Sequence, residues 1–443
     1  MNRIVLGIAA AAGLAITLGQ VPAAGQLGLK TRPSPFDGPT PAATQKIMRF
    51  FLTVPFALGE VDLSTLGVSA AELATVGPQA SASSGDDHML IVDNDGLDCP
   101  NAEYTTIQSA VDAATPGAKI KVCRGVYVEQ VVIPSSKDDI TLFSEGALQA
   151  VIKAPPVMID DKAIVQITGA TGVTIKHFTI SGPGGGPCDS LRWGVRVDSG
   201  GSALISHNHI TEIRDTPFSG CQNGIGVLVG RFFNPGGPTP GSAVVVHNLI
   251  DKYQKGGVVI DGPPGDGGIC CPDDFADFAA TTPVAGGSEV AFNIVVGIGA
   301  TPVIAQNGIQ VSREAAANVH HNKISYNNYA LSTTVGEGII LFQAGADSLA
   351  HHNFSERNDD GVGIFDTEGM EISYNHVEKN DFDGIYAGSD TANNLIAHNK
   401  AKDNAEHDCH DDTPGAPSLN QWIKDLGRTE NKPGLCKGAT VVP

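Results

Sequence analysis

Apolar and polar residues alternate with a period of two in the stretch 336–404. This stretch consists of three similar copies of one sequence segment. The copies read EGIILFQAGADSLAHHNFSERND, DGVGIFDTEGMEISYNHVEKND and DGIYAGSDTANNLIAHNKAKDN. The glycines Gly338, Gly361 and Gly384 recur every 23 residues. A fixed step of this size is typical of solenoids, and an internal period of two predicts strands. We therefore interpret each copy as one coil of a parallel β-helix.

Asparagines recur near the end of the second strand of each copy and again five residues later. A side-chain amide has a donor end and an acceptor end, so identical amides stacked one strand spacing apart can bond to each other. The pattern predicts two buried amide ladders at two corners of the coil. The first consists of Asn208, Asn248, Asn293, Asn322, Asn353, Asn375 and Asn399, and the second of Asn327, Asn358, Asn380 and Asn404.

The first 87 residues have a different character. Residues 1–24 contain an early Arg, an apolar run too short for a comfortable membrane span and a small-residue stretch, which predicts a signal peptide. Residues 25–87 are rich in Pro, Ala and Ser and read as an N-terminal extension, and residues 88–436 as the β-helix. We expect a protein that is secreted or periplasmic, with no membrane span after signal removal.

An amphipathic helix is expected over residues 104–114, with Ile107, Ala110, Val111 and Ala114 on one face. An open solenoid end exposes its core and its unpaired strand edges, so this helix is a suitable N-terminal cap. The following segment, KIKVCRGVYVEQVVI, predicts two strands joined at Gly125.

The segment YTTIQSAVDAATPGAKIKVCRGVYVEQVVI resembles the N-terminal cap and first coil of the pectin-lyase-like right-handed parallel β-helix superfamily. The Gly-Ile and His-Asn coils downstream resemble the generic repeats of the same superfamily. The resemblance covers residues 88–436 and implies an all-β, single-stranded right-handed solenoid with a helical N-terminal cap. It implies no single activity, because the superfamily includes polysaccharide lyases, glycoside hydrolases, uronan epimerases, esterases, adhesins and non-catalytic surface proteins.

The net charge of the chain limits the kinds of binding partner and cofactor to be expected. The net charge of −20 argues against a nucleic-acid partner, and such acidity could gather divalent cations, so Ca²⁺ is the cofactor to consider. We expect a monomer whose partner is a polysaccharide or cell-wall glycan.

Eight cysteines suit an exported protein. Three separated pairs are expected to form disulfides, namely Cys99 with Cys123, Cys188 with Cys221, and Cys409 with Cys436. The adjacent Cys270 and Cys271 have no assigned partners.

Outward positions on one sheet follow from the register, in which the residue after the repeat glycine points inward and the next points outward. A uronan lyase needs cations to neutralise the sugar carboxylate and a base, whereas a hydrolase needs two carboxylates. The candidate catalytic residues are Arg196, Arg231, Arg313, Asp198, Asp261 and Asp366. The alternative is that they are ion pairs at strand ends, and no polygalacturonase or alginate-epimerase motif is present.

Two further groups suggest binding. Phe342, Phe365 and Tyr386 fall at outward positions of three successive coils, which predicts either a glycan-binding strip or a stabilising aromatic ladder. The segment EHDCHDD contains five candidate metal ligands, which are His407, Asp408, His410, Asp411 and Asp412. The alternative is that these polar residues protect the unpaired strand edges at the C-terminal end of the solenoid. The recurring histidines before each ladder Asn are interpreted as structural corner residues.

These observations leave two interpretations of function. In the first, the protein is an exported β-helix that binds an extracellular polysaccharide and cleaves or modifies it, in a lyase-like manner on acidic glycans. In the second, it is a non-catalytic cell-surface or structural module.

Overall fold

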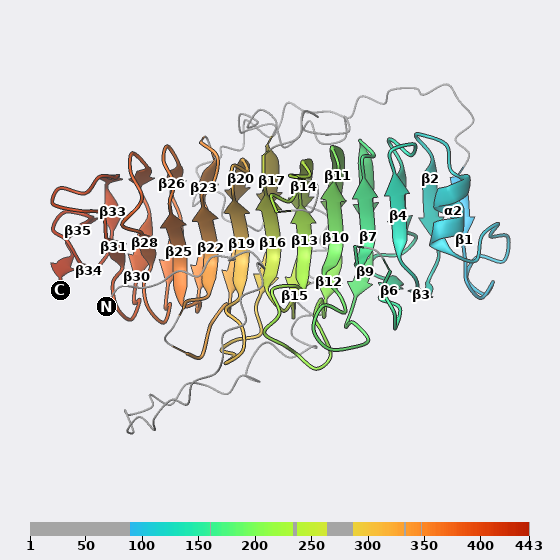
Figure 1. Cartoon of the computed structure of the whole chain (residues 1–443), viewed down its shortest axis with the longest axis horizontal. Coiled ribbons are helices and arrows are strands. Elements are labelled where there is room, and N and C mark those ends of the chain that lie inside the picture. The colour runs from blue at the N-terminus through green and yellow to red at the C-terminus, as the bar shows by residue number, and fades with distance from the viewer. Residues whose placement is uncertain are drawn as a thin grey trace, which may run out of the picture.

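The structure of the chain is a computed structural model that describes residues 89–159, 161–233, 237–263, 287–331, 334–346 and 348–442. The signal peptide and the extension expected from the sequence, and Cys270 and Cys271, lie outside the described residues. The chain forms an elongated parallel solenoid whose three sheets each contain 12 strands (Figure 1). Successive strands of one sheet come from successive coils, which confirms the interpretation of each sequence repeat as one coil.

Every pairing between named strands is parallel, as a solenoid requires. Sheet A consists of β1 (Met89–Val92), β2 (Lys119–Val122), β5 (Thr141–Ser144), β8 (Val173–Lys176), β11 (Gly201–Ser206), β14 (Gly241–Val246), β17 (Ser288–Ala291), β20 (Ala317–His320), β23 (Leu349–His351), β26 (Glu371–Ser373), β29 (Leu395–Ala397) and β32 (Gln421–Ile423).

Sheet B follows sheet A along each coil. It consists of β3 (Gly125–Val128), β6 (Ala150–Lys153), β9 (Thr179–Ser181), β12 (His209–Thr211), β15 (Leu249–Asp251), β18 (Ile294–Val296), β21 (Lys323–Ser325), β24 (Phe354–Glu356), β27 (His376–Glu378), β30 (Lys400–Lys402), β33 (Asp425–Leu426) and β35 (Cys436–Lys437).

Sheet C carries the predicted site residues on its outer face. It consists of β4 (Val131–Pro134), β7 (Ala163–Thr168), β10 (Trp193–Asp198), β13 (Ile225–Val229), β16 (Gly256–Asp261), β19 (Asn307–Ser312), β22 (Glu337–Phe342), β25 (Asp360–Phe365), β28 (Ile385–Ala387), β31 (Cys409–Asp411), β34 (Thr429–Glu430) and β36 (Thr440–Val441). The segment predicted as two strands joined at Gly125 forms three, β2, β3 and β4, because each strand belongs to a different sheet.

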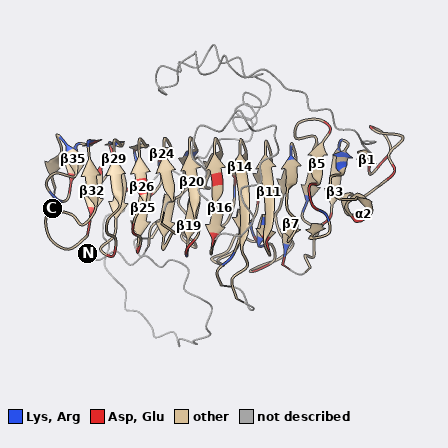
Figure 2. Cartoon of the chain, turned by 90° about the horizontal axis from the view of Figure 1, so that it is seen from above, with Lys and Arg blue, Asp and Glu red and all other residues tan. Residues whose placement is uncertain are grey.

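The core is a column of aliphatic residues, one layer for each coil. On sheet C a single register position supplies fully buried residues from consecutive coils: Val195, Val227, Val258, Ile309, Ile339, Val362 and Ile385. β-Branched side chains fit a pleated surface that is covered on the inner side. Most strand residues are uncharged, and many of the charged residues lie near strand ends and in turns (Figure 2).

The first amide ladder stands at the corner between sheets A and B, as predicted. Asn208 Nδ2 donates to Asn248 Oδ1 at 3.1 Å, and the same bond links each later pair as far as Asn399 at 3.0 Å. Each amide also donates to a backbone carbonyl, as Asn353 does to Val319 at 2.9 Å. The second ladder is also confirmed, and it runs from Asn327 to Asn404 at the corner between sheets B and C.

Both ladders end on an aspartate rather than another amide. Asn404 Nδ2 donates to Asp408 Oδ1 at 2.9 Å, and Asn399 Nδ2 donates to Asp425 Oδ1 at 2.8 Å. Asp425 is buried, and burial raises its pKa to about 7 although hydrogen bonds from Asn399 oppose the shift. Ionised Asp425 is therefore disfavoured in the folded protein.

This gives a prediction for the pH dependence of stability. Because the pKa of Asp425 is raised on folding, its stabilising contribution is present below the unfolded-state pKa of about 4 and is lost as the pH rises to about 7. Asp425→Asn keeps the acceptor for Asn399 and removes the ionisation, so it should stabilise the protein at pH 8 by up to roughly 4 kcal/mol. Denaturant titrations at pH 4 and pH 8 measure this. A variant no more stable at pH 8 than the parent, or stabilised equally at both pH values, contradicts it.

The residues before the first ladder form a second column, of stacked rings. His207, His247, Phe292 and His321 lie with ring centroids 4.9 to 5.1 Å apart, and the stack continues through His352, Tyr374 and His398. Each of these residues has a positive φ of 53 to 59°, which turns the ring outward while the next residue turns inward. The structural interpretation of the recurring histidines is thus confirmed.

A single described helix, α2 (Ile107–Ala113), lies at the N-terminal end of the solenoid beside β1 (Figure 1). It begins later than expected because Thr106 caps it and the Glu129 carboxylate accepts the backbone N–H groups of Ile107 and Gln108, each at 2.9 Å. Its buried residues Ile107, Ala110 and Val111 belong to the main core. That it closes the solenoid end against solvent stays a prediction. In the described part of the chain, no helix has the length and apolar character needed to span a membrane.

Candidate functional site

The outer face of sheet C brings the predicted residues into two rows along the solenoid. One row contains Arg196, Gln310, Tyr386 and His410, which share a register position with intervening aliphatic residues and Gly363. The other row runs from Asp261 through Ser312 and Phe342 to Phe365. The predicted residues therefore lie on one face, but spread over many coils.

Arg196 occupies the centre of the N-terminal part of this face. Its Nε lies 2.6 Å from Asp198 and its Nη1 lies 2.8 Å from Asp161, a loop residue that the sequence analysis did not select. The guanidinium carbon lies 4.3 Å from the ring centroid of Trp193, which is only 3% exposed. Arg196 and Asp198 thus form the ion pair that was the alternative to catalysis.

Two more guanidinium groups surround the same indole. Arg192 lies 5.7 Å and Arg231 lies 5.4 Å from the Trp193 ring centroid. Arg192 is paired with Asp189 through two hydrogen bonds, one of which, from Nη2, measures 2.8 Å. Arg231 is half-buried and has no carboxylate within ion-pair distance in the described ranges of the chain. Burial, and then the charges of Arg196 and Arg192, lower the pKa of Arg231.

Arg313 and Asp261 form a neighbouring group on the same face. Asp261 Oδ1 accepts from Arg313 Nε at 2.8 Å and from Ser312 Oγ at 2.7 Å, and Oδ2 accepts from the backbone N–H of Phe232 at 3.1 Å. The guanidinium of Arg313 also lies 5.1 Å from the ring centroid of Phe233, which is 47% exposed. Asp261 therefore ties the loop after β13 to β19 and places an exposed aromatic ring over a cation.

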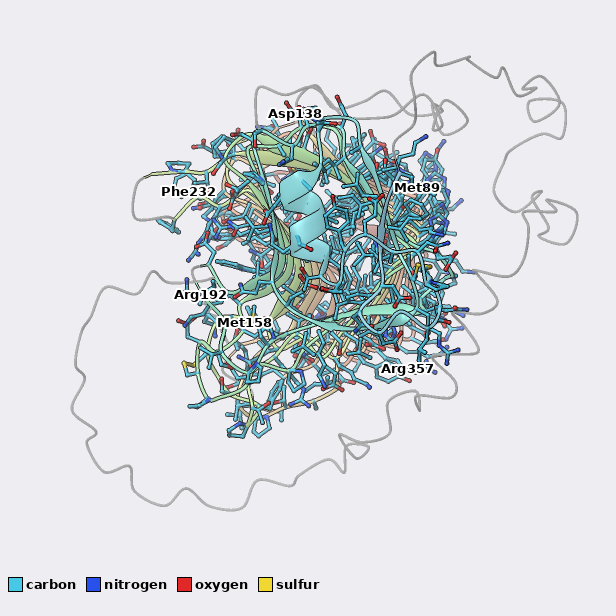
Figure 3. All side chains as sticks on the ribbon, turned by 90° about the vertical axis from the view of Figure 1, so that its right-hand side faces the viewer. Met89, Asp138, Met158, Arg192, Phe232 and Arg357 are labelled. Atoms are coloured by element: carbon cyan, nitrogen blue, oxygen red, sulfur yellow. A yellow bond between two sulfur atoms is a disulfide. The ribbon has the colours of Figure 1, made fainter. Side chains whose placement is uncertain are left out.

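We call Arg192, Trp193, Arg196, Arg231, Phe233 and Arg313 the cationic-aromatic patch. Seen along the solenoid axis, Phe232 and Arg192 lie on one side of the molecule, and Arg357 lies on the opposite side (Figure 3).

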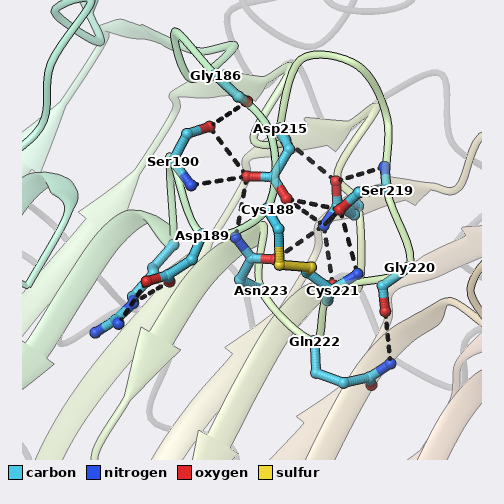
Figure 4. The surroundings of a disulfide bond; sticks show 12 residues. Gly186, Cys188, Asp189, Ser190, Asp215, Ser219, Gly220, Cys221, Gln222 and Asn223 are labelled. Carbon is cyan, nitrogen blue, oxygen red and sulfur yellow. Dashed lines mark hydrogen bonds and ion pairs between the residues drawn. A yellow bond between two sulfur atoms is a disulfide. The ribbon is translucent and has the colours of Figure 1, made fainter.

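A disulfide and a buried carboxylate hold the loops that border this patch. Cys188 and Cys221 join the loop before β10 to the loop before β13, with Cα atoms 5.6 Å apart (Figure 4). Asp215 lies beside the disulfide (Figure 4) and accepts hydrogen bonds from Ser190, Ser219, Asn223 and Gln254 at 2.8 to 3.2 Å. Burial raises the pKa of Asp215, but these hydrogen bonds outweigh it and the pKa lies below its usual value.

The other two predicted disulfides are also present. Cys99 pairs with Cys123 and Cys409 pairs with Cys436, with Cα separations of 6.2 and 6.1 Å.

The Asp215 network gives a stability prediction. Asp215→Asn points an amide N–H₂ group at donors, so buried hydrogen bonds are lost and the protein should be destabilised by roughly 2 to 3 kcal/mol. The amide protons of residues 186–190 should also exchange faster with solvent. Asp138→Asn, at an exposed turn where the side chain accepts from Thr171, is the matched control and should change stability little. Equal stability of the two variants would contradict the role given to Asp215.

The aromatic strip lies on the expected face, but only Phe342 is partly open to solvent. Phe365 and Tyr386 are 5% and 4% exposed, and together with Ile340 and Phe342 they form an apolar cluster. Phe365 and Tyr386 contact each other with ring centroids 5.4 Å apart. The exposure that a glycan-binding strip requires was inferred wrongly, because strand register gives the direction of a side chain and not what covers it. Asp366 lies nearby and accepts from Gln343 Nε2 at 2.7 Å.

The residues of the segment EHDCHDD have different structural roles. Asp408 ends an amide ladder, and the buried Asp411 accepts from Ser418, Trp422 and Asn420. His407 and His410 converge instead on Asp383, a residue outside the predicted set, and the ligand atoms of these three side chains lie within 4.8 Å of one another.

Asp412 contacts the same group from the other side. His410 Nε2 lies 3.0 Å from Asp412 Oδ1, and Asp412 Oδ2 accepts from Tyr386 at 2.9 Å. Burial lowers the pKa of His410, but its contacts with the carboxylates of Asp383 and Asp412 outweigh burial and raise the pKa to about 9.

Comparison with known proteins shows which proteins share this fold. The family model described as "Right handed beta helix region" matches residues 287–413. The chain has the fold of a right-handed parallel β-helix. The structure of a GH136 lacto-N-biosidase from Eubacterium ramulus is similar with a TM-score of 0.53 and 15% identity, over 80% of this chain and 67% of that chain. A comparison with curated proteins finds no match.

More distant β-helix structures align at lower scores. An alginate lyase from a Paenibacillus strain gives a TM-score of 0.45 and 14% identity, over 72% of this chain and 95% of that chain. A pectin methylesterase from carrot gives 0.39 and 14%, over 67% and 83%. For the β-helix described above, these similarities concern the fold alone.

Several residues of this β-helix site were missed by the sequence analysis. Trp193 and Asp383 immediately precede a repeat glycine, a position that the outward register did not count. Asp161, Arg192 and Phe233 lie in loops that have no strand period. A signal was available for Trp193, since a large aromatic with four arginines in the 40 residues 192–231 is unusual in a chain with two tryptophans.

Proposed function

We propose that this protein binds an anionic polysaccharide outside the cell through the cationic-aromatic patch. The observation that carries the proposal is Arg231, a half-buried guanidinium next to two others and without a carboxylate partner in the described segments. Arg192 and Arg196 are neutralised by Asp189, Asp161 and Asp198, so Arg231 is the cation of this group that an external anion would pair with.

The chemistry of the patch favours a particular anion. Guanidinium groups bind carboxylate, sulfate and phosphate groups through paired hydrogen bonds, and among the described residues no carboxylate pairs with Arg231. The exposed ring of Phe233 stands next to Arg313 and suits the apolar face of a sugar. A uronic acid or sulfated sugar in a chain offers both features at adjacent positions.

The pairing of the carboxylates supports binding rather than hydrolysis. A glycoside hydrolase needs one carboxyl group that delivers a proton to the leaving oxygen. Asp198 contacts Arg196 at 2.6 Å, and Asp261 accepts from Arg313, Ser312 and Phe232. These contacts hold Asp261 through both of its oxygens and Asp198 through Oδ2, so both groups are suited to holding the arginines in place.

Two further observations support an exported, glycan-directed role. Three disulfides suit an oxidising compartment outside the cytoplasm. The fold is shared with a lacto-N-biosidase, a carbohydrate-active protein.

The test is binding of the purified protein to polygalacturonate, alginate, a sulfated glycan and a neutral glucan by isothermal titration calorimetry. We expect binding to at least one anionic polymer and none to the neutral one, with affinity falling as salt is raised. Arg231→Gln removes one charge-assisted contact and should weaken binding by roughly 10- to 100-fold. The same samples are assayed for unsaturated products and reducing ends, which would reveal cleavage.

Arg357→Gln is the control, because Arg357 is an exposed arginine, paired with Glu356 at 2.9 Å, that lies on the opposite side of the solenoid (Figure 3). It should bind as the parent does. Equal losses in the two variants would indicate a nonspecific charge effect, and an unaffected Arg231→Gln would exclude the patch as the binding site.

A further inference from the structure

The group formed by Asp383, His407 and His410 has a second set of contacts that fixes the state of each imidazole. His407 Nε2 lies 2.8 Å from the carbonyl oxygen of Val442, which can only accept, so this nitrogen carries the hydrogen. His410 Nε2 lies 3.0 Å from the carboxylate of Asp412, again an acceptor. A neutral ring with its hydrogen on Nε2 presents an unprotonated Nδ1. Both histidines therefore turn Nδ1 toward Asp383.

The three side chains would present only electron pairs to one another. His407 Nδ1 lies 3.2 Å from Asp383 Oδ1, and His410 Nδ1 lies 2.8 Å from Asp383 Oδ2. The contact of His410 Nδ1 is close but lacks the alignment of a hydrogen bond, and this nitrogen is buried. A carboxylate faced by two imidazole nitrogens needs a positive charge between them, which is supplied either by protons on the rings or by a metal ion.

The spacing fits a metal ion. Ligands 2.0 to 2.1 Å from a tetrahedral zinc ion are about 3.3 Å from each other, close to the separations observed here. Two histidines and one carboxylate form a zinc site with a fourth position left for water or a ligand. Histidines that bind metals usually donate their other nitrogen to a carboxylate or a backbone carbonyl, which are the partners found for His410 and His407.

The fold holds this geometry on two adjacent coils. Asp383 immediately precedes Gly384 and β28, and His407 stands two residues before β31, whose His410 is in register with Tyr386. Asp383 is fully buried and is held from both sides, since its backbone N–H donates to Asp360 at 2.9 Å and its Oδ1 accepts the backbone N–H of His407 at 3.0 Å. The hydroxyl of Tyr386 in turn holds Asp412.

We infer that Asp383, His407 and His410 form a mononuclear zinc site on the outer face of sheet C, with Asp412 and Val442 orienting the two imidazoles. Asp383 and Asp412 together carry two negative charges, which the divalent cation neutralises. The site is independent of the proposed glycan binding, because its residues belong to β28, β31 and their flanking turns, whereas the patch belongs to β10, β13 and β19.

The test uses the purified, disulfide-bonded protein after removal of metals with a chelator. We expect one equivalent of Zn²⁺ to bind, by mass spectrometric metal analysis after gel filtration, and Co²⁺ to give the visible spectrum of a tetrahedral site. Asp383→Asn should abolish stoichiometric binding. Asp412→Asn should raise the dissociation constant roughly 10- to 100-fold, as loss of a carboxylate partner of a ligand histidine does.

The matched control is His398→Gln, which changes a histidine in the column of stacked rings. This variant should bind one Zn²⁺ like the parent. Circular dichroism and melting temperature establish that each variant is folded. If folded parent protein binds no Zn²⁺ or Co²⁺, the cluster is occupied by protons alone and the inference is wrong. Should Asp383→Asn fail to fold, an unchanged dissociation constant in Asp412→Asn overturns the inference by itself.

Discussion

The stacked amides at the corner between sheets A and B are the constraint on which the rest of this solenoid depends. At this corner the chain turns inward, and its backbone groups face the buried aliphatic core. Each asparagine satisfies such a carbonyl, as Asn353 does for Val319, and also bonds to the asparagines above and below it. An unsatisfied buried amide costs about 1 to 3 kcal/mol. The corner is therefore closed to insertion in every coil from Asn208 to Asn399.

Because that corner has a fixed length, variation in coil length falls on the other two corners, and both of these border sheet C. The loop before β10 carries Asp189 and Arg192, and the loop after β13 carries Arg231 and Phe233. Sheet C supplies a rigid floor, while loops at both of its edges supply charges and aromatic rings. This is the usual division of labour in solenoids, in which inserted loops build the binding face.

The fold could be predicted from the sequence because its determinants are local and repeated. A period of two, a glycine at a constant step and an asparagine at each corner are visible without knowledge of distant contacts, and the cysteine pairs followed from their positions between coils. The site could be predicted only in part. Register gave the direction of Arg196 and Tyr386 correctly, but exposure depends on what lies above a side chain, and Tyr386 is covered. Contacts such as that between Asp161 and Arg196 join a loop to a strand 35 residues away, and no periodic pattern records them.

The segment EHDCHDD shows why composition alone misassigns such residues. Read as a cluster, its ligands appear equivalent, yet the solenoid places successive residues in different environments. Asp408 faces inward and ends an amide ladder, Asp411 anchors the C-terminal tail, and His407 and His410 face a carboxylate contributed by the preceding coil. In a strand, alternate side chains point to opposite faces, so ligands adjacent in sequence diverge, while residues one coil apart approach within about 4.8 Å. Functional groups in a β-helix therefore have to be sought between coils, at matching register positions, rather than along a short stretch of sequence.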